Sequence, residues 1–224
     1  MLSGKSLEHV LLKKMEESEV DPVLKLNRSH KADAHSVLKT RIRELPWNRM
    51  PVILMGGSFN TQRRPTRIQP EASREVDRLL ALLDPEEFFF VIGHKMSGYE
   101  KYLVEKNRLL SNPFKIFAFV PSLVSREEKN RLMESEVHIR VSTESEGMGI
   151  YKSFNYEIFE RRPSILIGFD GNSAGTNLIQ EAKNGKGHAR IYVWDKCLAL
   201  RQKAESLEGY VTFFGEGNPL SITL

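Results

Sequence analysis

Short apolar runs alternate with segments of helical spacing over most of this chain. The runs are rich in Val, Ile and Phe and mostly do not alternate with polar residues, which is typical of strands buried on both faces of a parallel sheet. They lie at residues 52–55, 88–92, 115–120, 137–141, 164–169 and 190–194. The intervening helices are expected at about 70–83, 97–110, 125–134, 149–160 and 175–185. This alternation predicts an α/β fold with a doubly wound, mainly parallel sheet, followed by a helix at 196–207 and an edge strand at 210–214.

The first 49 residues follow a different pattern, because they contain no strand-like run. Leu7, Val10, Leu11 and Met15 recur at helical spacing, and a second helical stretch covers about 21–45. We therefore expect a helical N-terminal extension at 1–49 and one α/β domain at 50–224. The extension would pack on that domain or hold two subunits together, so a homo-oligomer is expected.

Composition bears on four features: nucleic-acid binding, disulfide bonds, metal sites and membrane attachment. The chain has 224 residues, a net charge of +4, and Lys and Arg spread along its length, which does not favour nucleic acid as a partner. Its one cysteine, Cys197, allows no intramolecular disulfide and no cysteine-based metal site. There is no run of about 20 apolar residues and no secretory signal pattern, so we expect a cytoplasmic protein without membrane attachment.

Three glycine-rich loops follow predicted strands and are expected to meet at one edge of the sheet. In an open parallel sheet, ligands bind beyond the carboxyl ends of the strands. Glycine lets backbone N–H groups approach an anion, and a helix N-terminus adds a favourable dipole. The loops read "GGSFN" from Gly56, "GHKMSG" from Gly93 and "DGNSAGT" from Asp170. Each loop taken alone is also consistent with a simple turn.

Two common nucleotide motifs are absent. Gly93 and Gly98 have the spacing of a P-loop, but Tyr99-Glu100 stand where its Lys-Ser/Thr would be. The first predicted strand is not followed by the GxGxxG of dinucleotide-binding domains.

The motifs in combination resemble another family. "VILMGGSFN", "FVIGHKMSGYEKYLVEKN", "YKSFNYEIFERRPSILIGF" and "GNSAGTNLIQEAKNGKGHARIYV" are similar, in order, to the SLOG superfamily of Rossmann-like domains, over about residues 50–195. That superfamily includes cytokinin-activating phosphoribohydrolases, DNA-processing proteins and nucleotide-sensing modules. The resemblance implies a Rossmann-like fold and a bound nucleotide or nucleotide-derived ligand, such as an ADP-ribose-like, NAD-derived or nucleoside-monophosphate molecule. It also implies a sensor role in stress or anti-phage signalling, with no required cofactor.

The chain departs from the catalytic members of these families. Phosphoribohydrolases of the superfamily carry acidic residues just after Gly-Thr, whereas Gly175-Thr176 is followed here by Asn177-Leu178. Similar-looking deoxyribosyltransferases have a nucleophilic Glu where this chain has Ile179, which cannot attack a sugar carbon. We therefore expect ligand binding without those carboxylates.

The candidate ligand-binding residues come from the three loops and one helix end. Thr176 also suits a helix start, His94 and Lys95 a solvated loop, and Asn155 simple packing. The arginines 63, 64 and 67 would contact phosphates or lie in solvent. The full set is Gly56, Gly57, Ser58, Phe59, Asn60, Gly93, His94, Lys95, Ser97, Gly98, Asn155, Asn172, Ser173, Ala174, Gly175 and Thr176. A bulky replacement of Gly175 is expected to abolish binding and leave the fold intact.

Two other functions stay open. The first is an N-glycosidase or phosphoribohydrolase that uses a relocated carboxylate, with Glu100 and Glu157 as the candidates. The second is a single-stranded DNA-binding protein, which the modest charge disfavours. His30, Asp33 and His35 resemble a metal cluster on paper, but 35 would point away from the other two on a helix, so no metal site is expected.

Overall fold

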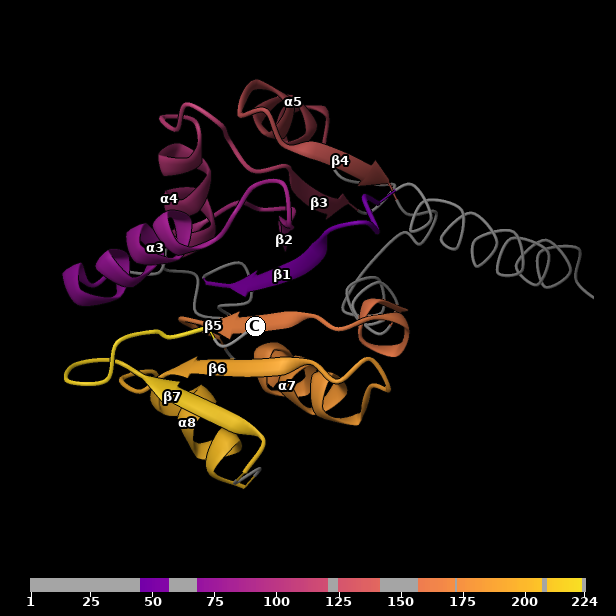
Figure 1. The fold of residues 1–224 in the computed structure, drawn as a ribbon. Coiled ribbons are helices and arrows are strands. Elements are labelled where there is room, and N and C mark those ends of the chain that lie inside the picture. Colours follow the sequence, from indigo (N-terminus) through magenta and orange to yellow (C-terminus); the bar gives the residue numbers. More distant parts are fainter. Residues whose placement is uncertain are drawn as a thin grey trace, which may run out of the picture.

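A computed structural model of the chain shows a Rossmann-like α/β fold (Figure 1). The structure describes residues 45–56, 68–120, 125–141, 157–171, 173–206 and 209–222. The expected extension at 1–49 lies almost wholly outside these residues, and residues 45–49 form an irregular lead into the first strand.

All seven described strands form one sheet, and every neighbouring pair is parallel. The order across the sheet is β4-β3-β2-β1-β5-β6-β7. The strands are β1 (Met50–Met55), β2 (Phe88–Gly93), β3 (Ile116–Val120), β4 (His138–Val141), β5 (Ile165–Gly168), β6 (Arg190–Trp194) and β7 (Val211–Phe214). The predicted fold class is therefore confirmed, and β7 is the edge strand expected at 210–214.

Five helices with described bounds connect the strands. They are α3 (Pro70–Leu82), α4 (Gly98–Asn107), α5 (Arg126–Glu134), α7 (Ser173–Asn184) and α8 (Leu198–Glu205). Local sequence explains two of their starts: α3 begins with a proline, and Ser125 and Glu128 form a capping box at α5. Of the helix expected at 149–160, the described part is helical over residues 157–161.

The sheet has an apolar core on each face, because successive strand residues point to opposite sides. In β1, for example, Val52 and Leu54 belong to one core cluster and Ile53 and Met55 to the other. The first cluster contains residues of α3, α4 and α5, and the second contains residues of α7 and α8. Figure 1 shows α3, α4 and α5 beside the β1–β4 half of the sheet, and α7 and α8 beside the β5–β7 half.

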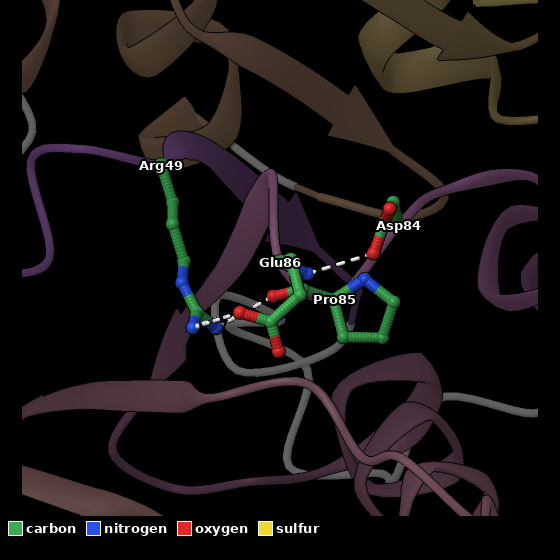
Figure 2. A network of polar contacts seen from close by, with 4 residues as sticks. All are labelled: Arg49, Asp84, Pro85 and Glu86. Atoms are coloured by element: carbon green, nitrogen blue, oxygen red, sulfur yellow. Dashed lines mark hydrogen bonds and ion pairs between the residues drawn. The ribbon is translucent and has the colours of Figure 1, made fainter.

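A polar network fixes the amino-terminal edge of the sheet, where β1 and β2 begin (Figure 2). The Arg49 guanidinium donates to the Pro85 carbonyl at 2.6 Å and to the Glu86 carboxylate at 2.8 Å. The Glu86 backbone N–H in turn donates to the Asp84 carboxylate at 2.8 Å. These contacts join residue 49, just before β1, to the segment just before β2, and so help to set the register of the two strands.

Candidate functional site

The order of the strands reverses beside β1. The chain runs from β1 through β2 and β3 to β4 on one side, then returns to place β5 on the other side of β1 and continues to β7. Helix α3, which follows β1, and helix α7, which follows β5, accordingly pack on opposite faces of the sheet. In open α/β sheets, ligands bind in a crevice outside the carboxyl ends of two such strands, and this edge is where we expect one here.

The three predicted loops begin at the same level of this edge. Met55 is paired with Gly168 in the register of β1 and β5. The pairing of Ile53 with Val91 places Gly93, two residues further on, level with Met55. The central strands β2, β1 and β5 thus release their loops side by side, as predicted for Gly56, Gly93 and the residues after Gly168.

Tyr99 packs at this edge of the sheet, on the α3–α4 face. Its backbone N–H donates to the Gly56 carbonyl at 2.6 Å, and its hydroxyl accepts the Gln69 N–H at 2.9 Å. Its ring stacks on Phe169 with centroids 5.0 Å apart, and Phe169 packs edge-on against Phe214. A Cβ on Gly56 would collide with the Tyr99 side chain. Gly56 therefore serves this close packing, whatever else it contacts.

Glycines of the third loop pack around Leu200 of α8 on the opposite face. A Cβ at Gly168 or Gly171 would lie 2.9 Å from a Leu200 methyl group, and one at Gly175 would lie 3.1 Å away. A Gly175 Cβ would also lie 3.5 Å from the Met55 sulfur. Because this position is buried in the packing, a bulky side chain there would disturb the fold as well as any ligand. The expectation that such a change separates binding from folding is therefore unsuited to Gly175.

Asp170 lies directly after β5, at the mouth of the crevice, and is half-buried. Its carboxylate accepts the Gly171 N–H at 2.8 Å and lies 3.8 Å from the Cys197 sulfur. Burial raises the pKa of the Cys197 thiol, and Asp170 adds to that rise, so the thiol stays protonated. Burial likewise raises the pKa of the Tyr99 phenol, helped by Asp170 and Cys197. The candidate list omitted Asp170 and Cys197. The sequence did place Asp170 at the start of the third glycine-rich loop. Nothing in the sequence predicts that Cys197 lies beside it, because the two residues come together only in the folded chain.

The loop after β2 contacts α5. The Lys95 carbonyl accepts a bond from Arg131 at 3.1 Å. The pKa of His94 lies below its ordinary value because the ring is desolvated, an effect that nearby Glu128 opposes. Met96 and Gly98 adopt left-handed backbone conformations with φ of 46° and 56°, so Gly98 eases the turn into α4. Ser97 precedes that helix without capping it through its side chain.

The backbone N–H groups at the starts of α4 and α7 are the candidate donors for an anion at this edge of the sheet. In α4, the Tyr99 N–H is committed to Gly56 and the Glu100 N–H to the Ser97 carbonyl. Helix α7 begins at the crevice with Ser173 and includes Ala174, Gly175 and Thr176 in its first turn. The first N–H groups of a helix lack intrahelical partners and carry a partial positive charge. Helix α7 is the second helix that begins at this edge, and its N-terminus is the other candidate for such donors.

Six of the predicted residues cannot be assigned a position. Gly57, Ser58, Phe59, Asn60, Asn155 and Asn172 lie outside the described residues, as do the arginines 63, 64 and 67 and the histidines 30 and 35. Among the residues that the structure does describe, no group of three His, Cys, Asp or Glu side chains could hold a metal ion.

The structure does not bring the two candidate carboxylates together at the crevice. Glu100 is fully buried in α4. Glu157 forms an ion pair with Arg161 at 2.7 Å, in the short helical stretch just before β5, on the side of the amino-terminal edge. Ile179 is fully buried in the core between α7 and the sheet.

No protein-family model and no curated protein sequence matches this chain. Within the described ranges, none of the helices combines the length and the apolar character needed to cross a membrane.

Proposed function

We propose that this protein is a SLOG-like binding module for a nucleotide or nucleotide-derived ligand. The ligand class is ADP-ribose-like, NAD-derived or nucleoside monophosphate, and it lies in the crevice between the ends of β1 and β5. The observation that carries this proposal is the reversal of strand order beside β1, with Asp170 and the start of α7 at the adjoining carboxyl edge of the sheet. In this arrangement the first turn of α7 binds a phosphate, and Asp170 accepts hydrogen bonds from ribose hydroxyls.

A sensor role follows from the resemblance to nucleotide-sensing members of the superfamily. The geometry agrees with binding better than with turnover, because Glu100 is buried and Glu157 is paired with Arg161 away from the crevice. The protein would then report ligand occupancy to a partner or to a second copy of itself.

The first test is mass spectrometry of the purified protein after incubation with NAD, ADP-ribose, cyclic ADP-ribose isomers and nucleoside monophosphates. A retained, unaltered nucleotide supports the proposal. A free base together with a ribosyl product would replace it with the N-glycosidase alternative.

A charge substitution at α7 tests the location. Ser173→Asp places an acid at a helix N-terminus, where it favours the helix but repels a phosphate. We expect binding to weaken by about tenfold or more while thermal stability is kept. Gln180→Glu, which adds the same charge two turns further along α7, is the matched control. Equal affinity in both variants would place the phosphate elsewhere.

A further inference from the structure

A second opening lies between α3 and the segment after β7. It is an open pocket of about 440 Å³, within the usual range for small-molecule sites. Figure 1 shows the chain turning back after β7 toward β5, which brings residues 215–219 near the sheet's carboxyl edge. The pocket is lined by Glu71, Arg74, Glu75, Arg78, Trp194, Gly215, Glu216, Gly217 and Pro219.

Most of the charges around this pocket are satisfied by one another. The Glu75 carboxylate accepts the Leu220 N–H at 2.8 Å and lies 3.5 Å from the Arg78 guanidinium. Glu216 pairs with Lys196 at 3.1 Å. The contact between Glu75 and Leu220 also ties the C-terminal segment to α3, so it holds the far wall of the pocket in place.

Two opposite charges are left over. Glu71 and Arg74 line the pocket, and neither forms an ion pair with any described residue. They are three residues apart on α3, so their side chains start from neighbouring positions on one helix face. A ligand with both a negative and a positive group could pair with each of them in turn, whereas a ligand with a single charge could pair with only one.

Apolar residues form the inner side of the pocket. Trp194 is 1% exposed and lines the pocket together with Pro219. Its indole N–H has no hydrogen-bond partner among the described residues. Buried donors are rarely left in this state.

We propose that this pocket binds a small zwitterion of the amino-acid class. The ligand carboxylate meets the Arg74 guanidinium, and its ammonium group meets the Glu71 carboxylate. An uncharged side chain suits the wall that the exposed Pro219 forms above the buried Trp194. None of the lining residues belongs to the set proposed to bind the nucleotide, so this inference does not rest on the function proposed above.

Binding is measured by saturation-transfer NMR on the full chain with uncharged, non-aromatic L-amino acids as probes. Leucine, N-acetyl-leucine and leucinamide form a matched series that carries both charges, the carboxylate alone and the ammonium alone. We expect saturable binding of a free amino acid and loss of binding when either charge is blocked. No saturable binding by any probe, or equal binding of the blocked forms, would overturn the proposal.

Two variants and a reporter locate the site. Arg74→Gln and Glu71→Gln are each expected to weaken binding by about tenfold or more, because each removes a charge-assisted hydrogen bond. Arg126→Gln, an exposed arginine on α5, should have no effect. The chain has two tryptophans, so Trp47→Phe leaves Trp194 as the only one, and its fluorescence should change with the same saturation curve. Binding that is unchanged by both variants, or that leaves Trp194 fluorescence unaffected, would contradict the assignment.

Discussion

Two glycine-rich segments flank α7, and they lie at opposite edges of the sheet. At the amino-terminal edge, a Cβ on Gly185 would lie 2.6 Å from the Phe159 carbonyl oxygen, and one on Gly187 would overlap the carbonyls of Arg162 and Phe159. At the carboxyl edge, Gly171 and Gly175 face methyl groups of Leu200 instead. Backbone cannot move aside, whereas the end of a leucine side chain can.

The difference shows that glycine content alone does not identify a binding loop. Both segments place small residues directly next to α7. Only the segment at the carboxyl edge combines a helix N-terminus with the reversal of strand order. The chemistry of the site therefore depends on topology, and the glycines at each edge first serve packing.

The largest expected effect comes from exchanging glycine for alanine at the two edges. Gly187→Ala should lower the free energy of unfolding by about 2–4 kcal/mol, because its Cβ would strike two carbonyls and its N–H donates to Phe159 at 2.6 Å. Gly175→Ala should stay within about 1 kcal/mol of the parent, since Leu200 can shift and alanine favours a helix. Urea unfolding of both variants measures the difference. Equal losses would remove the contrast between the edges.

The polar network at the amino-terminal edge should give the next largest effect. Arg49→Met keeps much of the apolar stem and removes two hydrogen bonds, at 2.6 and 2.8 Å. The Arg49 side chain is 13% exposed, so we expect a loss of about 1–2 kcal/mol in unfolding free energy.

The control for Arg49 is a surface ion pair. Lys101→Met breaks the exposed pair with Glu105 at 3.6 Å and should cost less than about 0.5 kcal/mol. A variant at Arg49 as stable as the control would show that the network does not hold the edge. Ligand affinity at the carboxyl edge should be unchanged in both variants.

Sequence predicted the fold well, because buried strands carry a strong local signal. The expected run at 52–55 became β1, and the terminal edge strand was found at Val211–Phe214. The start of the three loops at one edge also followed from the expectation of a parallel sheet. The contacts of individual loop residues could not be predicted from the sequence, because these contacts join distant parts of the chain. Asp170 and Cys197 are 27 residues apart, and the Lys95 carbonyl finds Arg131 36 residues away.

The free energy of unfolding should depend on pH through His94, which lies in the loop after β2. Burial holds the pKa of His94 below its ordinary value of 6.5, so the unfolded chain takes up this proton at a higher pH than the folded protein does. The stability that the neutral, buried His94 ring contributes to the fold is intact above pH 6.5, and it is lost as the pH falls toward the lower pKa of the folded protein. Urea unfolding across this range should show a steeper decline for the parent than for His94→Gln. His188→Gln, at an exposed histidine, controls for loss of a ring. A decline that His94→Gln leaves unchanged would contradict the desolvation of this ring.

The smallest effect is a change of reaction rate at the chain's one cysteine, and it reports directly on the carboxyl edge. The thiolate is the reactive form, and burial with the nearby Asp170 carboxylate raises the pKa of Cys197. Iodoacetamide should therefore label the folded protein more slowly than the urea-unfolded chain at neutral pH. Asp170→Asn should speed labelling of the folded protein, because it removes the negative charge 3.8 Å from the sulfur, whereas Asp77→Asn on α3 should not. A nucleotide in the crevice should slow labelling of the parent by covering Asp170. If a bound nucleotide left the rate unchanged, its site would lie away from the end of β5, and the contrast between the two edges would concern packing alone.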